Sequence, residues 1–158
     1  MGIFRRRRKT QQMQYNSATS KKICISFDWH NDSKYRNMLG AWLANADNPL
    51  NFEDLTPGAI DTDDVSRVKG VLTTQIRAAT HTLVLIGSEA NAKHKDSTKI
   101  GARNWIWWEI EQSKTEGNGL IAVKISSTDP TPDPLYNSGA TWAMSFNQPA
   151  ILKAIDEA

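Results

Sequence analysis

The segment NWIWWEIEQS, residues 104–113, places three tryptophans in four positions and follows them directly with a glutamate. Trp105 and Glu109 are four residues apart, so on a helix they share one face, with Trp108 beside it and Ile106 and Ile110 pointing elsewhere. A carboxylate among aromatic rings is partly desolvated, and its attraction to a nearby cation is correspondingly stronger. The pattern favours a lone carboxylate that acts on positive charge. The alternative is that the tryptophans are core residues and Glu109 is a solvated charge at the rim.

Several other chemistries lack the residues that they need. A phosphoacceptor domain needs an aspartate at the end of its third strand, where this sequence has Gly87-Ser88. A nucleoside triphosphatase needs a glycine-rich phosphate loop with its lysine, and the sequence contains none. The three histidines and Cys24 have no zinc-like spacing, and the acidic run at 61–64 lacks the glycine and glutamate of a calcium loop. We therefore expect no metal site.

The hydrophobic pattern predicts the elements that position Glu109. Apolar runs predict strands over residues 22–29, 50–56, 81–88, 120–126 and 141–146. Amphipathic stretches predict helices from about Tyr35, after Asp64, around the tryptophans and from Pro149, and residues 89–103 are expected to form a long loop. The order βαβαβαββα indicates an α/β protein with a mainly parallel five-stranded sheet and helices on both faces. This is the three-layer flavodoxin-like fold, with strand order 2-1-3-4-5.

Ligands of such sheets bind beyond the carboxyl ends of the strands. Three predicted strands end there in polar or aromatic residues: Phe27-Asp28-Trp29, Glu53-Asp54 and Gly87-Ser88. The sequence therefore predicts a site at this edge, next to the tryptophan-rich helix.

The positive charge of the chain is concentrated at one end. The formal net charge is +2, but residues 1–22 contain seven Lys or Arg and no acid. This leaves 12 basic and 17 acidic residues, a net of −5, for residues 23–158. We expect residues 1–22 to be a disordered basic leader and residues 23–158 to form one domain. Neither nucleic-acid binding nor membrane contact through Arg5–Lys9 is expected, and the single cysteine favours a cytoplasmic location.

Four segments together resemble the TIR-like domain family: ICISFDWHNDSKYRNMLGAWLAN, NFEDLTPG, DDVSRVKGVLTTQIRAATHTLVLIGS and NWIWWEIEQSKTEGNGLIAVKI. The resemblance runs from about Ile23 to Ile125 and is strongest to the bacterial branch of Thoeris anti-phage systems. Trp105 and Glu109 match the W-x-x-x-E spacing of enzymatic TIR domains. The resemblance implies a flavodoxin-like TIR fold that takes NAD as its substrate, without a prosthetic group, and cleaves its nicotinamide–ribose bond.

The same resemblance implies roles for individual residues. Glu109 would be the catalytic residue, and Trp105 or Phe27 would stack on a ring of NAD. Asp28, Asp54 and Ser88 would contact NAD, with the turn at 53–58 closing the pocket.

One carboxylate suits this reaction, because nicotinamide leaves cationic NAD as a neutral pyridine and needs no general acid. The ribosyl centre left behind is electron-poor, and Glu109 would stabilise it. The family implies a cyclic or conjugated ADP-ribose product that activates a partner effector protein. The alternative is a non-catalytic TIR module that acts by self-association, as a TIR–TIR homo-oligomer.

Overall fold

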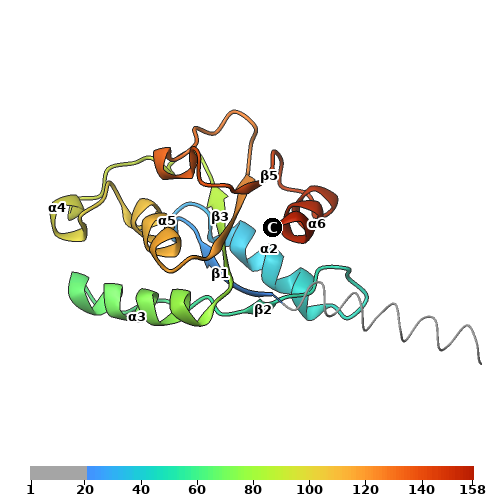
Figure 1. The fold of residues 1–158 in the computed structure, drawn as a ribbon, viewed down its shortest axis with the longest axis horizontal. Helices are drawn as coiled ribbons and strands as arrows, with labels where there is room; N and C mark the ends of the chain where they lie inside the picture. The colour runs from blue at the N-terminus through green and yellow to red at the C-terminus, as the bar shows by residue number, and fades with distance from the viewer. Residues whose placement is uncertain (1–20) are drawn as a thin grey trace, which may run out of the picture.

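The computed structural model describes residues 21–158 of the chain (Figure 1). Its sheet contains five parallel strands in the order β2-β1-β3-β4-β5. These strands are β1 Lys22–Ser26, β2 Glu53–Asp54, β3 His81–Ile86, β4 Gly119–Lys124 and β5 Thr141–Ala143. The strand order and the parallel pairing are those of a flavodoxin-like sheet, so the predicted fold class is confirmed. The basic leader, apart from its last two residues, lies outside the described part of the chain.

The helices form the two outer layers of the molecule. They are α2 Ser33–Ala44, α3 Val65–Ala78, α4 Ser97–Ile100, α5 Trp105–Thr115 and α6 Gln148–Glu157, with a short 3-10 helix at Asp133–Leu135. Figure 1 shows α2 and α6 on one side of the sheet and α3 and α5 on the other. Within residues 21–158, no helix is long and apolar enough to cross a membrane.

Alternation along the strands gives each face its own core. Ile23 and Ile25 of β1 pack with α2 and α6, in a cluster that includes Leu39 and Ile151. Residues of β3 and β4 that point the other way pack against Ile106 and Ile110 of α5. Because side chains of a strand alternate between faces, Cys24 and Ser26 point toward α3 and α5. That face carries the site.

The second strand is much shorter than the predicted span of 50–56. Leu50 and Phe52 are buried as expected, but only residues 53 and 54 pair with β1 as a strand. The ladder ends because side chains replace backbone partners: the Ile25 amide donates to Thr56 Oγ1 at 2.8 Å, and the Thr56 amide donates to Asp54 Oδ1 at 2.9 Å. The predicted long loop at 89–103 also contains the short helix α4.

Candidate functional site

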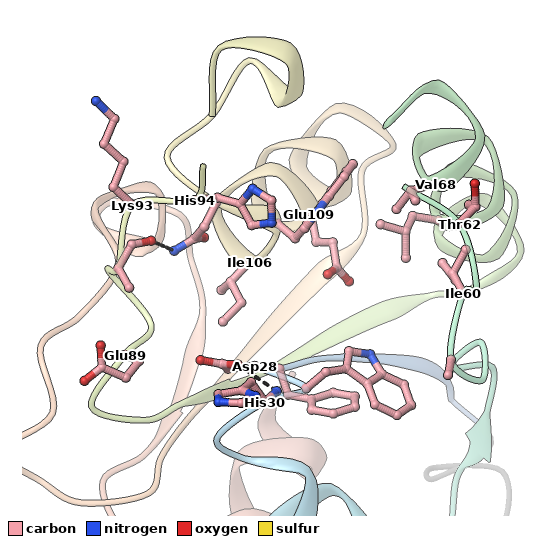
Figure 2. A pocket seen from close by; sticks show the side chains of 17 residues that line it. Asp28, His30, Ile60, Thr62, Val68, Glu89, Lys93, His94, Ile106 and Glu109 are labelled. Atoms are coloured by element: carbon pink, nitrogen blue, oxygen red, sulfur yellow. Dashed lines mark hydrogen bonds between the residues drawn. The ribbon is translucent and has the colours of Figure 1, made fainter. Parts of the chain in front are cut away.

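A pocket of about 600 Å³ opens at the carboxyl ends of β1 and β3, between α3 and α5 (Figure 2). This size lies within the range of about 300–1,000 Å³ that is usual for small-molecule sites. Four segments line it: the loop after β1 (Phe27, Asp28, Trp29, His30), the segment into α3 (Ala59, Ile60, Thr62, Val68, Leu72), the loop after β3 (Glu89, Ala92, Lys93, His94) and the start of α5 (Asn104, Trp105, Ile106, Glu109). The site therefore lies at the predicted edge of the sheet.

Glu109 lines this pocket although only 8% of the residue is exposed. Its carboxylate points into the cavity (Figure 2), and it forms no salt bridge within residues 21–158. Burial raises the pKa of Glu109 to about 8, an effect that the nearby Ser26 hydroxyl partly opposes. Glu109 is thus neither a solvated residue at the rim nor held by a cation. It is a desolvated acid facing an open cavity.

The start of α5 is anchored to the loop that follows β3. Asn104 caps the helix, with its Oδ1 accepting the Trp107 amide at 2.9 Å. Its Nδ2 donates to the carbonyls of Ala90 and Ala92 at 2.8 and 2.9 Å. Asn104 is itself buried, so these bonds fix the helix and the loop together. Two walls of the pocket consequently form one unit.

A buried hydroxyl pair fixes the turn of α5 that carries Glu109. Ser113 Oγ donates to the Glu109 carbonyl at 2.7 Å and lies 2.6 Å from Thr82 Oγ1 on β3. Because the Ser113 proton is engaged by that carbonyl, Thr82 must donate to Ser113. Both residues are fully buried.

Ser113→Ala is expected to destabilise the protein by about 1–3 kcal/mol, because it leaves the buried Thr82 hydroxyl without a partner. Urea unfolding of this variant, of Thr82→Val and of the double variant measures the effect. The double variant should lose less than the sum of the two single losses, since it removes both hydroxyls together. Additive losses would show that the pair does not act as a unit.

Two residues of β1, Ser26 and Cys24, lie near Glu109. Ser26 is fully buried, and its Oγ makes no hydrogen bond of ordinary geometry to any residue in the described range. Cys24 is also buried, and its pKa is raised to about 12 by burial and by the negative charges of Glu109 and Asp54. The thiol therefore stays protonated and is not a nucleophile. Of Cys24 and Glu109, it is therefore Glu109 that can ionise and act at the pocket.

The structure brings together four of the six residues that the sequence nominated: Phe27, Asp28, Trp105 and Glu109 line one pocket. Phe27, however, is only 6% exposed. Ile106, which was expected to point elsewhere, also lines the cavity and extends into it in Figure 2.

Asp28 lies at the pocket, but its carboxylate is used by its own loop. Oδ1 accepts the amides of His30 and Asn31 at 2.9 and 3.3 Å, and Oδ2 accepts Asn31 Nδ2 at 2.8 Å. Such bonds hold a tight turn. Asp28 therefore organises the loop after β1 rather than presenting a free carboxylate to a ligand.

Asp54 and Ser88 are not among the residues that line the pocket. Asp54 Oδ2 pairs with Arg36 Nη2 at 2.5 Å, while its Oδ1 accepts a backbone amide, so both oxygens brace the edge of the sheet. Ser88 is exposed just beyond β3. The turn at 53–58 is likewise absent from the lining, and its place is taken by the next residues, from Ala59 to Thr62.

Sequence reasoning assigned no role to Trp29 or His94, which both line the pocket. His94 Nδ1 accepts the Asp96 amide at 2.9 Å. In the neutral ring the proton must then sit on Nε2, which makes that nitrogen a hydrogen-bond donor. The spacing of residues in the sequence could not predict that His94 lines the pocket, because its position depends on the conformation of the loop at residues 89–103. Trp29 was placed at the predicted edge of the sheet together with Phe27 and Asp28, but it was given no role in binding.

The tryptophans of α5 have different surroundings. The rings of Trp105 and Trp108 meet edge to face, with centroids 5.8 Å apart. Trp105 lines the pocket, whereas Trp108 lies outside the lining and has Lys69 Nζ 5.9 Å from its centroid. Trp105 is therefore the tryptophan of this helix that a ligand would meet.

The free energy of unfolding of Glu109→Gln, relative to that of wild type, is expected to increase as the pH rises from 4.5 to 8. The folded protein keeps the Glu109 proton up to a pKa of about 8, while the unfolded chain releases it near 4.5. The folded state binds more protons in this window, so wild-type stability falls with pH, by at most about 1.4 kcal/mol per unit from this group. Urea unfolding of both proteins between pH 5 and 9 measures the difference. Parallel pH curves would contradict the burial of an unpaired carboxyl.

Comparison with known proteins agrees with this geometry. A family model described as "Thoeris protein ThsB, TIR-like domain" matches residues 24–130, about two-thirds of the chain. The match runs from within β1 to beyond β4 and contains every residue that lines this pocket. A search of curated proteins finds no match. With the flavodoxin-like sheet, the family match shows that this chain belongs to the Thoeris ThsB TIR-like domain family and is a defence-related TIR protein.

Proposed function

We propose that this protein cleaves NAD at the nicotinamide–ribose bond, with Glu109 as the catalytic residue. The observation that carries the proposal is the Glu109 carboxyl, which is buried, free of any salt bridge in the described chain and directed into a pocket of about 600 Å³. Burial disfavours the ionised form of this carboxyl, and a positive charge nearby would offset that penalty. The ribose of NAD develops such a charge when nicotinamide departs.

The reaction needs little else from the protein. The bond from the ribose anomeric carbon to nicotinamide breaks, and its electron pair leaves with the neutral pyridine ring. The ionised Glu109 then faces an electron-poor ribosyl centre, and in a poorly hydrated pocket this attraction is stronger than in water. A cationic substrate also favours ionisation of Glu109 and so lowers its pKa on binding.

The walls beside Glu109 favour a product other than simple ADP-ribose. Val68, Leu72, Trp105 and Ile106 give this part of the pocket an apolar surface. Apolar walls exclude water, which favours attack by a bound nucleophile over hydrolysis. We expect a cyclic or conjugated ADP-ribose that signals to a partner effector protein during anti-phage defence. The cytoplasm, where NAD is available, is the expected location.

Incubation of the purified protein with NAD tests the proposal. Released nicotinamide is followed by chromatography, and mass spectrometry of the mixture distinguishes ADP-ribose, a cyclic isomer and an amino-acid conjugate. Nicotinamide should appear in step with NAD loss, with a phage-derived stimulus supplied as a second condition. A wild-type protein that stays inactive under both conditions would contradict the proposal.

A second candidate function is non-catalytic self-association. The observation that favours it is the edge strand β5, near which Trp142 and Met144 are 37% and 52% exposed. An open strand edge with exposed apolar side chains is suited to pairing with another chain. Light scattering of wild type and of Trp142→Asp separates the candidates. Loss of assembly in the variant, with no NAD turnover by wild type in any state, would favour this second function.

A further inference from the structure

The loop after β1 places a large aromatic ring at the pocket and leaves much of that ring exposed to solvent. Trp29 lines the pocket and is 53% exposed, whereas Phe27, two residues earlier, is buried. The two rings pack with centroids 4.8 Å apart and planes tilted by 41°. Phe27 thus supports Trp29 from within the protein. A tryptophan with this exposure keeps much of its apolar surface in water until something covers it.

The backbone that carries Trp29 is held in place before any ligand binds. The Asp28 carboxylate accepts the next-but-one amide, from His30, and the Asp28 carbonyl accepts the Asp32 amide at 2.8 Å. The Trp29 carbonyl accepts the Ser33 hydroxyl from the first turn of α2. A ring on a fixed loop loses little conformational entropy when a ligand stacks on it. The arrangement is that of a preformed platform.

Depth in the pocket indicates which part of a ligand meets this platform. Both residues line the pocket, but Glu109 is only 8% exposed, whereas Trp29 is 53% exposed and so lies where the pocket meets solvent. If the scissile ribose and nicotinamide lie beside Glu109, the other end of the dinucleotide extends toward the mouth. That end is adenine, a flat heteroaromatic ring, which stacks well on tryptophan.

We propose that Trp29 is the stacking platform for the adenine ring of the dinucleotide, supported by Phe27 and held by the Asp28 turn. The assignment rests on the proposed function for the choice of substrate, and it adds the residue that orients the substrate in the pocket. Trp29 is a binding residue, and Asp28 is a positioning residue that acts through the loop. Lys93 and His94, on the loop after β3, also line the pocket.

Calorimetric titration with two ligands tests the assignment without requiring turnover. ADP-ribose contains the adenine ring, and nicotinamide mononucleotide lacks it. Trp29→Ala is expected to weaken ADP-ribose binding by roughly 5- to 150-fold, the usual range for losing a base–aromatic stack. Trp29→Phe should retain most of the affinity. Nicotinamide mononucleotide should bind wild type and Trp29→Ala equally, because it never reaches the ring.

Trp142→Ala is the matched control, since Trp142 is also an exposed tryptophan but lies on β5, outside the pocket lining. It should leave both affinities unchanged. Unchanged ADP-ribose binding in Trp29→Ala, equal weakening for both ligands or no ADP-ribose binding to wild type would each overturn the assignment. Absence of nicotinamide release with the ADP-ribose result intact would instead overturn the proposed reaction alone. If Trp29 contacts a second copy of the chain rather than adenine, light scattering and not ligand affinity will change in Trp29→Ala.

Discussion

Glu109→Gln is expected to slow nicotinamide release by about two to three powers of ten at pH 8. Glutamine keeps the shape of the side chain and can still hydrogen-bond a ribose hydroxyl, but it cannot carry the negative charge that the ribosyl centre attracts. Loss of about 3–4 kcal/mol of transition-state stabilisation corresponds to a change of this size. The rate is measured by chromatography of nicotinamide under saturating NAD, where the chemical step is least masked by binding.

Glu111→Gln is the matched control for this substitution. Glu111 lies on the same helix two residues later, is exposed and pairs only at the surface with Lys114, at 3.6 Å. Its replacement makes the same change in charge and should leave the rate within about twofold, as expected for a surface position. Comparable losses in the two variants would mean that the net charge of α5, and not the carboxyl in the pocket, controls the rate.

Gly87→Ala is expected to destabilise the protein by about 3 kcal/mol. A Cβ at this position would lie 2.3 Å from Asp32 Oδ2 and 2.7 Å from Oδ1, too close for any real contact. Asp32 is 6% exposed and begins α2 as its N-cap, so its side chain has little room to withdraw. Crowding of a packed interior usually costs about 1–3 kcal/mol, and here the displaced group is a carboxylate. Thermal and urea unfolding measure the loss.

Two variants make this prediction specific. In an Asp32→Ala background the clash is removed, so Gly87→Ala should then cost little. Gly70→Ala is the matched control, because Gly70 lies inside α3 with no atom within 4 Å of an added Cβ. It should stabilise the protein by about 0.5–1 kcal/mol, since alanine favours the helix. A tolerated Gly87→Ala in the wild-type background would mean that Asp32 does not fill this space.

The sequence allowed the sheet and the catalytic candidate to be predicted, because both depend on local patterns. Continuous apolar runs such as 83–86 are long enough to identify buried strands, and their alternation with helices indicates the parallel order. The four-residue spacing of Trp105 and Glu109 places both side chains at the pocket, as helix geometry requires. These inferences required no knowledge of the surrounding side chains.

The roles of the other residues depend on hydrogen bonds, both distant and local, that their spacing in the sequence does not reveal. Asp54 looked available at the end of β2, but Arg36 of α2 pairs with it from 18 residues away. Asp28 looked equally available, but its oxygens are used within two or three residues by its own turn. Conversely, Trp29 gained importance because Phe27 beside it is buried and leaves it as the exposed ring. Strand ends can be predicted only to within a few residues, and such shifts decide which side chains reach the pocket.

The pH dependence of kcat/KM for nicotinamide release from NAD tests the central role of Glu109 most directly. This parameter reports ionisation in the free protein, where the pKa of Glu109 is about 8 because the carboxyl is buried. If the ionised carboxylate is the form that stabilises the ribosyl cation, kcat/KM should rise about tenfold per pH unit below 8 and level off above it. A profile that is flat between pH 6 and 9, in a protein that does release nicotinamide, would contradict the account.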